Sequence, residues 1–189
     1  TGHIAPIAHD LYMQIVEQAV QRLKGQVVEE EPDPVLRLNV SAFIPDEYVA
    51  DPHQRLSCYK RLSSCTQIGD LALLHGEIQD RYGLAPDSVE RLFEVMQIRL
   101  QAKALRLSSI ELKPHAAVIT LDANSRVSSQ AIHQVMERYK KRLCFLSPLS
   151  FELRMPHEDW PSIFRELTAM LQSLKGCGTN TTTSPQLPC

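Results

Sequence analysis

The chain has 189 residues, a formal net charge of −2 and 43% hydrophobic residues, values typical of one globular domain with an appendage. The small net charge gives no overall basic field for nucleic acid, and no apolar run approaches the ~20 residues that cross a bilayer, so no membrane partner is expected. The cysteines contain no CxxC pair, which favours free thiols in a reducing cytoplasm over a disulfide framework or a zinc site: Cys58, Cys65, Cys144, Cys177 and Cys189.

The N-terminal part of the chain changes from a helical to an extended pattern. Apolar residues recur at helical spacing over residues 10–24, and Gly25 ends that stretch. The acidic and proline-bearing residues 26–34 predict a linker. Residues 35–45 then alternate apolar and polar side chains, which predicts a half-buried strand, and we expect Leu36–Ala42 to lie in the centre of a sheet.

The middle of the chain is predicted to be helical up to residue 107. One helix is expected over residues 53–64 and a second over Ile68–Tyr82, with Thr66 as its N-cap. A third helix is expected over residues 85–107, beginning near Pro86. The helical spacing predicts that this third helix buries Val89, Leu92, Phe93, Met96 and Leu100.

The last third of the chain mixes strand and helix patterns. Residues 108–113 and 116–122 predict two strands paired as a hairpin, and residues 149–155 predict another strand. Further helices are expected over residues 128–143 and 160–175. The resulting order of elements predicts an α+β fold in which a small mixed sheet packs with several helices.

Two polar segments, the serine pair at 128–129 and the C-terminal residues 176–189, have different interpretations. Ser128 and Ser129 stand at a helix start, where serine is more consistent with capping than with a nucleophile. Residues 176–189 are polar and rich in Thr and Pro, which predicts a disordered tail.

A search for chemical motifs finds no catalytic set. The seven glycines form neither GxxxxGK[ST] nor GxGxxG, and residues 157–159 lack the second ligand one helical turn away that a metal site requires. The basic residues 137–143 leave two interpretations open. They form a solvated helix face that complements the helix dipole, or they contact nucleic acid through Lys140, Lys141 and Arg142. The sequence therefore predicts no enzyme activity and no cofactor in this chain.

The stretch "EIQDRYGLAP" (residues 77–86) places two acids, Glu77 and Asp80, one turn apart on the same face of a predicted helix. They lie at the C-terminal end of that helix, where the macrodipole disfavours carboxylates. A positively charged partner explains this placement, and simple solvation explains it as well. Arg81 is a local candidate for neutralising one of the two acids.

Three blocks of this sequence, in this order, resemble the C-terminal part of the bacterial transcription-repair coupling factor family (Mfd). The end of the family's translocase motor is similar to "GHIAPIAHDLYMQIVEQAV". The family's IPDxYI…RLxxYKRL block is similar to "AFIPDEYVADPHQRLSCYKRLSS", and its ELxDRFGxLP block to "EIQDRYGLAPDSVERLFEV". The likeness is densest over residues 35–107. The sequence departs from the family at Ala8 and His9, where Gly-Phe is expected, and at Tyr82, where the family has Phe.

The resemblance implies a division of the chain into three parts. Residues 1–33 correspond to the end of the translocase motor and a linker, residues 34–175 to the C-terminal regulatory domain, and residues 176–189 to the disordered tail. The parent protein is then expected to be an ATP-dependent translocase on double-stranded DNA, with ATP and Mg bound in its motor and not in this fragment. It removes RNA polymerase stalled at lesions and recruits UvrA for nucleotide excision repair.

The resemblance also implies what the regulatory domain does. In the family it docks on the UvrB-like module of the same polypeptide, masks the UvrA-binding surface and represses the motor. Carried over by motif, Glu77 and Asp80 correspond to the acids that meet basic side chains of that module. These two residues are therefore the expected protein-interaction site.

Overall fold

The computed structural model describes residues 33–176. These residues form an α+β fold with a five-stranded mixed sheet, which confirms the predicted fold class. The helix expected at residues 10–24 and the tail expected after Gly176 lie outside the described residues. None of the helices within 33–176 is long and apolar enough to span a membrane.

The sheet has the strand order β1-β2-β3-β5-β4. Its strands are β1 (Val35–Arg37), β2 (Leu107–Lys113), β3 (Ala116–Leu121), β4 (Leu143–Ser147) and β5 (Ser150–Arg154). Strands β2 and β3 form the predicted hairpin, whose turn places His115 at a φ of 59°. Strand β1 runs parallel to β2, whereas the remaining neighbours are antiparallel, so the sheet is mixed.

The prediction that Leu36–Ala42 forms a central strand is wrong. Strand β1 has three residues and lies at an edge of the sheet. Its pairing ends near Asn39, which adopts a left-handed backbone conformation with a φ of 46°. The alternation that suggested a long strand is nevertheless present in the burial, because Leu38 is buried and Asn39 is exposed. Alternating apolar and polar side chains indicate an extended chain, whether or not a neighbouring strand forms hydrogen bonds with it.

The predicted helix at residues 128–143 is four residues too long. Helix α5 (Ser129–Tyr139) begins after Ser128, whose hydroxyl accepts a hydrogen bond from the Ala131 amide at 3.1 Å, as expected of a cap. It ends because Lys140 has a φ of 45° and starts a short 3₁₀ turn, η1 (Lys140–Arg142). The chain then enters β4, a strand that the sequence pattern did not reveal.

The remaining helices are α2 (Pro52–Ser64), α3 (Ile68–Tyr82), α4 (Asp87–Ala104) and α6 (Trp160–Lys175). Helices α3 and α6 have the predicted bounds. The prediction that Thr66 is the N-cap of α3 is wrong, because the N-cap is Gln67. The Asp70 carboxylate accepts hydrogen bonds from the amides of both Thr66 and Gln67, which fixes the helix start one residue later.

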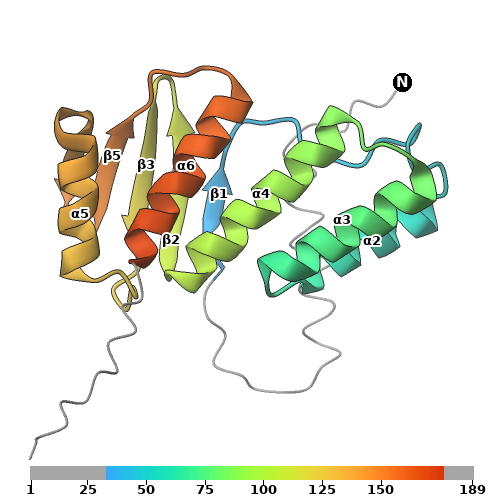
Figure 1. Cartoon of the computed structure of the whole chain (residues 1–189), viewed down its shortest axis with the longest axis horizontal. Coiled ribbons are helices and arrows are strands. Elements are labelled where there is room, and N and C mark those ends of the chain that lie inside the picture. Colours follow the sequence, from blue (N-terminus) through green and yellow to red (C-terminus); the bar gives the residue numbers. More distant parts are fainter. Residues whose placement is uncertain (1–32, 177–189) are drawn as a thin grey trace, which may run out of the picture.

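Helix α4 takes part in two hydrophobic cores. On one side, Ile98 and Ala102 join the core between the sheet, α5 and α6. On the other side, the five residues predicted to be buried are buried against α2 and α3: Val89, Leu92, Phe93, Met96 and Leu100. Figure 1 shows α4, α5 and α6 on one face of the sheet, with α2 and α3 on the far side of α4.

Candidate protein-interaction surface

The two acids expected to bind a partner lie on the exposed side of α3. This helix buries Leu71, Leu74 and Ile78 against its neighbours. Glu77 and Asp80 are both exposed, as the three-residue spacing between them predicts for one helix face. Both carboxylates are thus available at the protein surface.

Glu77 already has a partner within the domain. Its carboxylate forms an ion pair with the Arg61 guanidinium from α2, and both side chains remain more than half exposed. An exposed pair of this kind contributes ~0–1 kcal/mol. Arg81, the local candidate from the sequence, instead lies 5.4 Å from the centroid of the Tyr82 ring. The neutralising residue therefore comes from a neighbouring helix, which sequence spacing could not reveal.

Asp80 makes neither an ion pair nor a side-chain hydrogen bond with any residue in the part of the chain that the structure describes. Leu73 lies on the same helix face, at i, i+4 and i+7 with Glu77 and Asp80, and is 72% exposed. Just beyond the helix, Leu84 is 90% exposed. We define the acidic face of α3 as Leu73, Glu77 and Asp80. It combines negative charge with an exposed apolar side chain.

Several contacts hold the end of α3 in place. Helix α3 stops at Gly83, which has a φ of 89° that only glycine adopts without strain. The Tyr48 hydroxyl donates to the Gly83 carbonyl at 2.7 Å, and the Tyr82 hydroxyl donates to Gln54 of α2 at 2.7 Å. The acidic face is therefore carried on a fixed helix and not on a loop.

The other residues considered for chemistry have structural roles. Asp159 caps α6, and hydrogen bonds from the hydroxyl and amide of Ser162 lower the pKa of its carboxyl group. Burial raises the pKa of the Cys58 and Cys65 thiols, so both are protonated at neutral pH. Residues 33–176 contain no group of three metal-ligating side chains. Of the groups considered in residues 33–176, the acidic face of α3 is the one suited to binding a partner protein.

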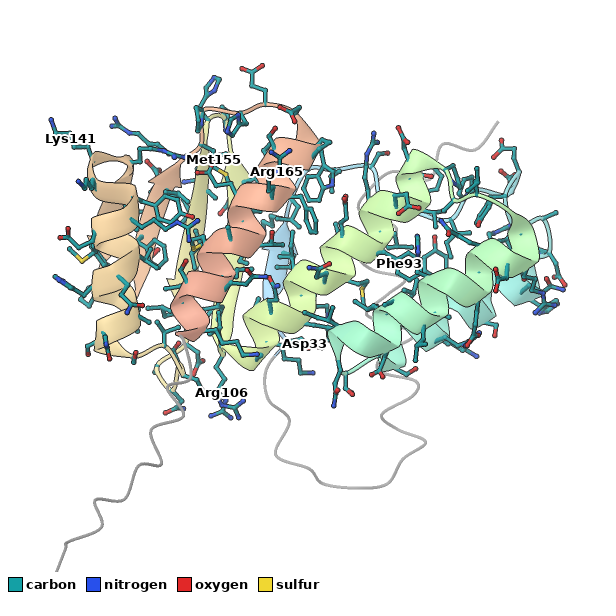
Figure 2. The ribbon with its side chains drawn as sticks, viewed as in Figure 1. Asp33, Phe93, Arg106, Lys141, Met155 and Arg165 are labelled. Carbon is teal, nitrogen blue, oxygen red and sulfur yellow. The ribbon has the colours of Figure 1, made fainter. Side chains whose placement is uncertain are left out.

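A second charged feature lies where α5, η1 and α6 meet. There the surface forms a recess of about 380 Å³, and eight residues line it: Arg138, Tyr139, Arg142, His157, Ser162, Arg165, Glu166 and Ala169. Figure 2 shows Arg165 on α6 and Lys141 beyond the end of α5, toward the same end of the sheet. The sequence pattern had pointed only to the basic run at 137–143. Arg165 is more than 20 residues away and shows no matching signal.

The chain is similar to known proteins over most of its length. A family model for the TRCF domain matches residues 38–132, just over half of the chain. A transcription-repair-coupling factor from Myxococcus xanthus is 32% identical over 178 residues, which is 94% of this chain and 15% of that protein. One from Escherichia coli is 29% identical over 135 residues, covering 68% of this chain and 12% of that protein.

The fold has a counterpart among solved structures. A crystal structure of the C-terminal domain of a transcription-repair coupling factor superposes with a TM-score of 0.68 at 18% identity. It covers 75% of this chain and 91% of that chain.

These features define the class of the protein as an α+β domain that presents an acidic helix face on a fixed scaffold. The chain belongs to the TRCF domain family of transcription-repair coupling factors, and its fold is that of their C-terminal domain. It spans about 15% of the length of the Myxococcus xanthus relative.

Proposed function

We propose that this domain regulates its parent protein by docking the acidic face of α3 on basic side chains of a UvrB-like module in the same polypeptide. The observation that carries the proposal is the exposed Asp80, which has no charged partner among residues 33–176 and lies one turn from Glu77. Leu73 adds an exposed apolar side chain that a partner surface can bury. In the docked state the domain masks the UvrA-binding surface and represses the motor.

The expected strength of this contact suits a switch. Exposed ion pairs contribute ~0.2–1 kcal/mol each, and bidentate arginine contacts contribute more. Two such contacts shift a closed–open equilibrium by about tenfold, so binding of RNA polymerase elsewhere on the parent can open it. Arg61 competes for Glu77 inside the domain, and we therefore assign the larger share of the docking energy to Asp80.

We infer that the motor activity of the parent resides in a part of the polypeptide outside this chain. We infer a parent that translocates on double-stranded DNA with ATP and Mg, removes stalled RNA polymerase and recruits UvrA in the bacterial cytoplasm. The name of the relatives supports a role in coupling transcription to repair. The chain itself has no phosphate-binding loop, so the motor chemistry belongs to another part of the polypeptide.

Replacing both Glu77 and Asp80 by Ala in the full-length parent tests the docking proposal. We expect the fold to be retained, because exposed helix positions tolerate Ala, and we expect UvrA binding and polymerase-independent ATP hydrolysis to rise. Asp80→Ala alone should account for most of the effect. High salt should produce part of the same increase in the unmodified protein, since exposed charges are screened.

A matched control removes two exposed acids away from α3, namely Glu137 and Glu158. This Glu137→Ala, Glu158→Ala variant changes the net charge equally and should leave UvrA binding unchanged. If the α3 variant is folded and binds UvrA no better than the parent at low salt, the docking role of the acidic face is wrong.

A nucleic-acid-binding role for residues 137–143 is the second candidate. Lys140 and Lys141 favour it, because both are exposed and have no acidic partner in the described part of the chain. Arg142, however, is engaged with Glu166. A titration with a short DNA duplex at several salt concentrations tests this role, and binding independent of Lys140 and Lys141 contradicts it.

A further inference from the structure

The recess between α5, η1 and α6 has a charge distribution that the docking of α3 does not explain. Three arginines line it, and the only carboxylate among its lining residues is that of Glu166. Arg138 comes from the last turn of α5, Arg142 from η1 and Arg165 from the middle of α6. Elements distant in the chain thus bring three guanidinium groups around one hollow.

Among residues 33–176, only one of these arginines is paired with a carboxylate. Arg142 pairs with the Glu166 carboxylate, and its Nε and Nη2 atoms donate to the Arg154 carbonyl at 3.0 and 2.8 Å. Arg138 donates through Nη1 to the Ser173 hydroxyl at 2.9 Å and lies 5.6 Å from the Tyr139 ring centroid. Neither contact carries a negative charge.

The Arg165 side chain is exposed, and its guanidinium makes no ion pair or hydrogen bond with another residue of the described range 33–176. The recess therefore holds two guanidinium groups, Arg138 and Arg165, without an acidic partner there. Together these groups offer a site for anionic groups.

The shape of the site distinguishes between two kinds of anionic partner. A phosphodiester group is part of a continuous backbone, which lies along a surface and requires a row of exposed cations. A Glu or Asp carboxylate stands at the end of a side chain and can enter a hollow, where arginine binds it in a bidentate manner. Because the cations here surround a recess and Arg142 is turned inward to Glu166, the geometry favours carboxylates.

We propose that this recess is a second docking site, which binds an acidic segment of a partner protein through Arg138 and Arg165. Glu or Asp side chains of that segment enter the recess and form charge-assisted hydrogen bonds with the guanidinium groups of Arg138 and Arg165, neither of which has an acidic partner among residues 33–176. The site lies on α5 and α6, apart from the acidic face of α3, and it has the opposite charge. The domain then has two electrostatically distinct contact surfaces.

Fluorescence anisotropy of a labelled octaglutamate peptide, titrated with the full 189-residue chain, tests the proposal. We expect saturable binding that weakens with salt, and no binding of octaglutamine. The double variant Arg138→Gln, Arg165→Gln should bind octaglutamate about tenfold more weakly, since each charged hydrogen bond contributes measurably. Amide NMR signals of Ser162 and Ala169 should shift on binding.

The control is Arg37→Gln, which removes one exposed arginine from β1 at the opposite edge of the sheet. It should bind octaglutamate as the unmodified chain does, and circular dichroism should show that all variants are folded. The proposal is overturned if octaglutamate does not bind saturably or if the double variant binds it equally well. It is also overturned if a short DNA duplex binds more tightly than octaglutamate and loses its binding in the same variant.

Discussion

The guanidinium group of Arg142 joins three elements of the fold. From η1 it reaches the Arg154 carbonyl at the end of β5 and the Glu166 carboxylate on α6. The side chain of Glu166 is 13% exposed, and its Oε2 atom is buried without a hydrogen-bond partner among the described residues. Arg142 is thus the group that stabilises a mostly buried carboxylate, and its role differs from that of the exposed Arg165.

Arg142→Gln should therefore destabilise the domain. Loss of the guanidinium leaves the Glu166 carboxylate buried without its charged donor, which costs about 2 kcal/mol. Urea unfolding should show a lower midpoint with an unchanged m-value. Arg165→Gln is the matched control, because Arg165 is exposed and its substitution should leave the midpoint unchanged. Equal stability of the two variants would show that Arg142 does not stabilise Glu166.

At the level of elements, the junction between α5 and β4 shows why the sequence pattern extended the helix too far. The basic residues after Tyr139 fit a helical C-terminus, and nothing in their order marks a turn. In the structure Lys140 takes a left-handed backbone conformation, which is uncommon for a non-glycine residue. The contacts of Arg142 with β5 and α6 are formed only in the folded domain, so they carry no local signal.

The same junction gives a testable prediction. Lys140 has a φ of 45° and a ψ of −120°, a strained conformation for a residue with a Cβ atom. Lys140→Gly should relieve that strain and stabilise the domain by about 0.5–1 kcal/mol, measured by urea unfolding. Lys141→Gly is the control, because Lys141 has no positive φ and carries no such strain. This change only increases the conformational entropy of the unfolded chain, so it should destabilise the domain. A Lys140→Gly variant that is less stable than the unmodified chain contradicts the strain argument.

The sequence predicts the bounds of some helices and strands better than those of others. Helices α3 and α6 were found with their bounds, because each has a long apolar stripe and a glycine at its end. Strand β1 was overestimated, since the pattern shows that a chain is extended but not whether it has a partner. Of the candidate site, the exposure of Glu77 and Asp80 followed from helical spacing. The pairing of Glu77 with Arg61 depends on how α2 packs beside α3, which spacing does not encode.

In the whole molecule, helix α4 determines how the two cores are connected. One side of the helix, from Val89 to Leu100, belongs to the core with α2 and α3, and the other side, with Ile98 and Ala102, belongs to the core with the sheet. Asp33, at the start of the described chain, connects the segment before β1 to α4. Its carboxylate binds Arg99 at 2.6 Å and Lys103 at 2.9 Å, both on α4. The acidic face on α3 is therefore attached to the sheet through one continuous helix.

This shared helix predicts that residues 33–176 unfold in a single cooperative transition. Leu92 lies in the core with α2 and α3, whereas Ile98 lies in the core with the sheet, and both are almost fully buried. Replacing either residue by Ala creates a cavity and costs about 2–5 kcal/mol. If α4 couples the cores, both variants should lower one common midpoint when near-UV and far-UV circular dichroism are recorded against temperature.

The control is Ala104→Ser, a small change at an exposed position of the same helix that should leave the midpoint almost unchanged. Independent cores would give a different result, in which Leu92→Ala splits unfolding into two steps and only the first moves to lower temperature. In that case α2 and α3 would be able to detach from the sheet domain while it stays folded. The acidic face would then move relative to the recess at α5 and α6, and a partner bound at one surface would not restrict the position of the other.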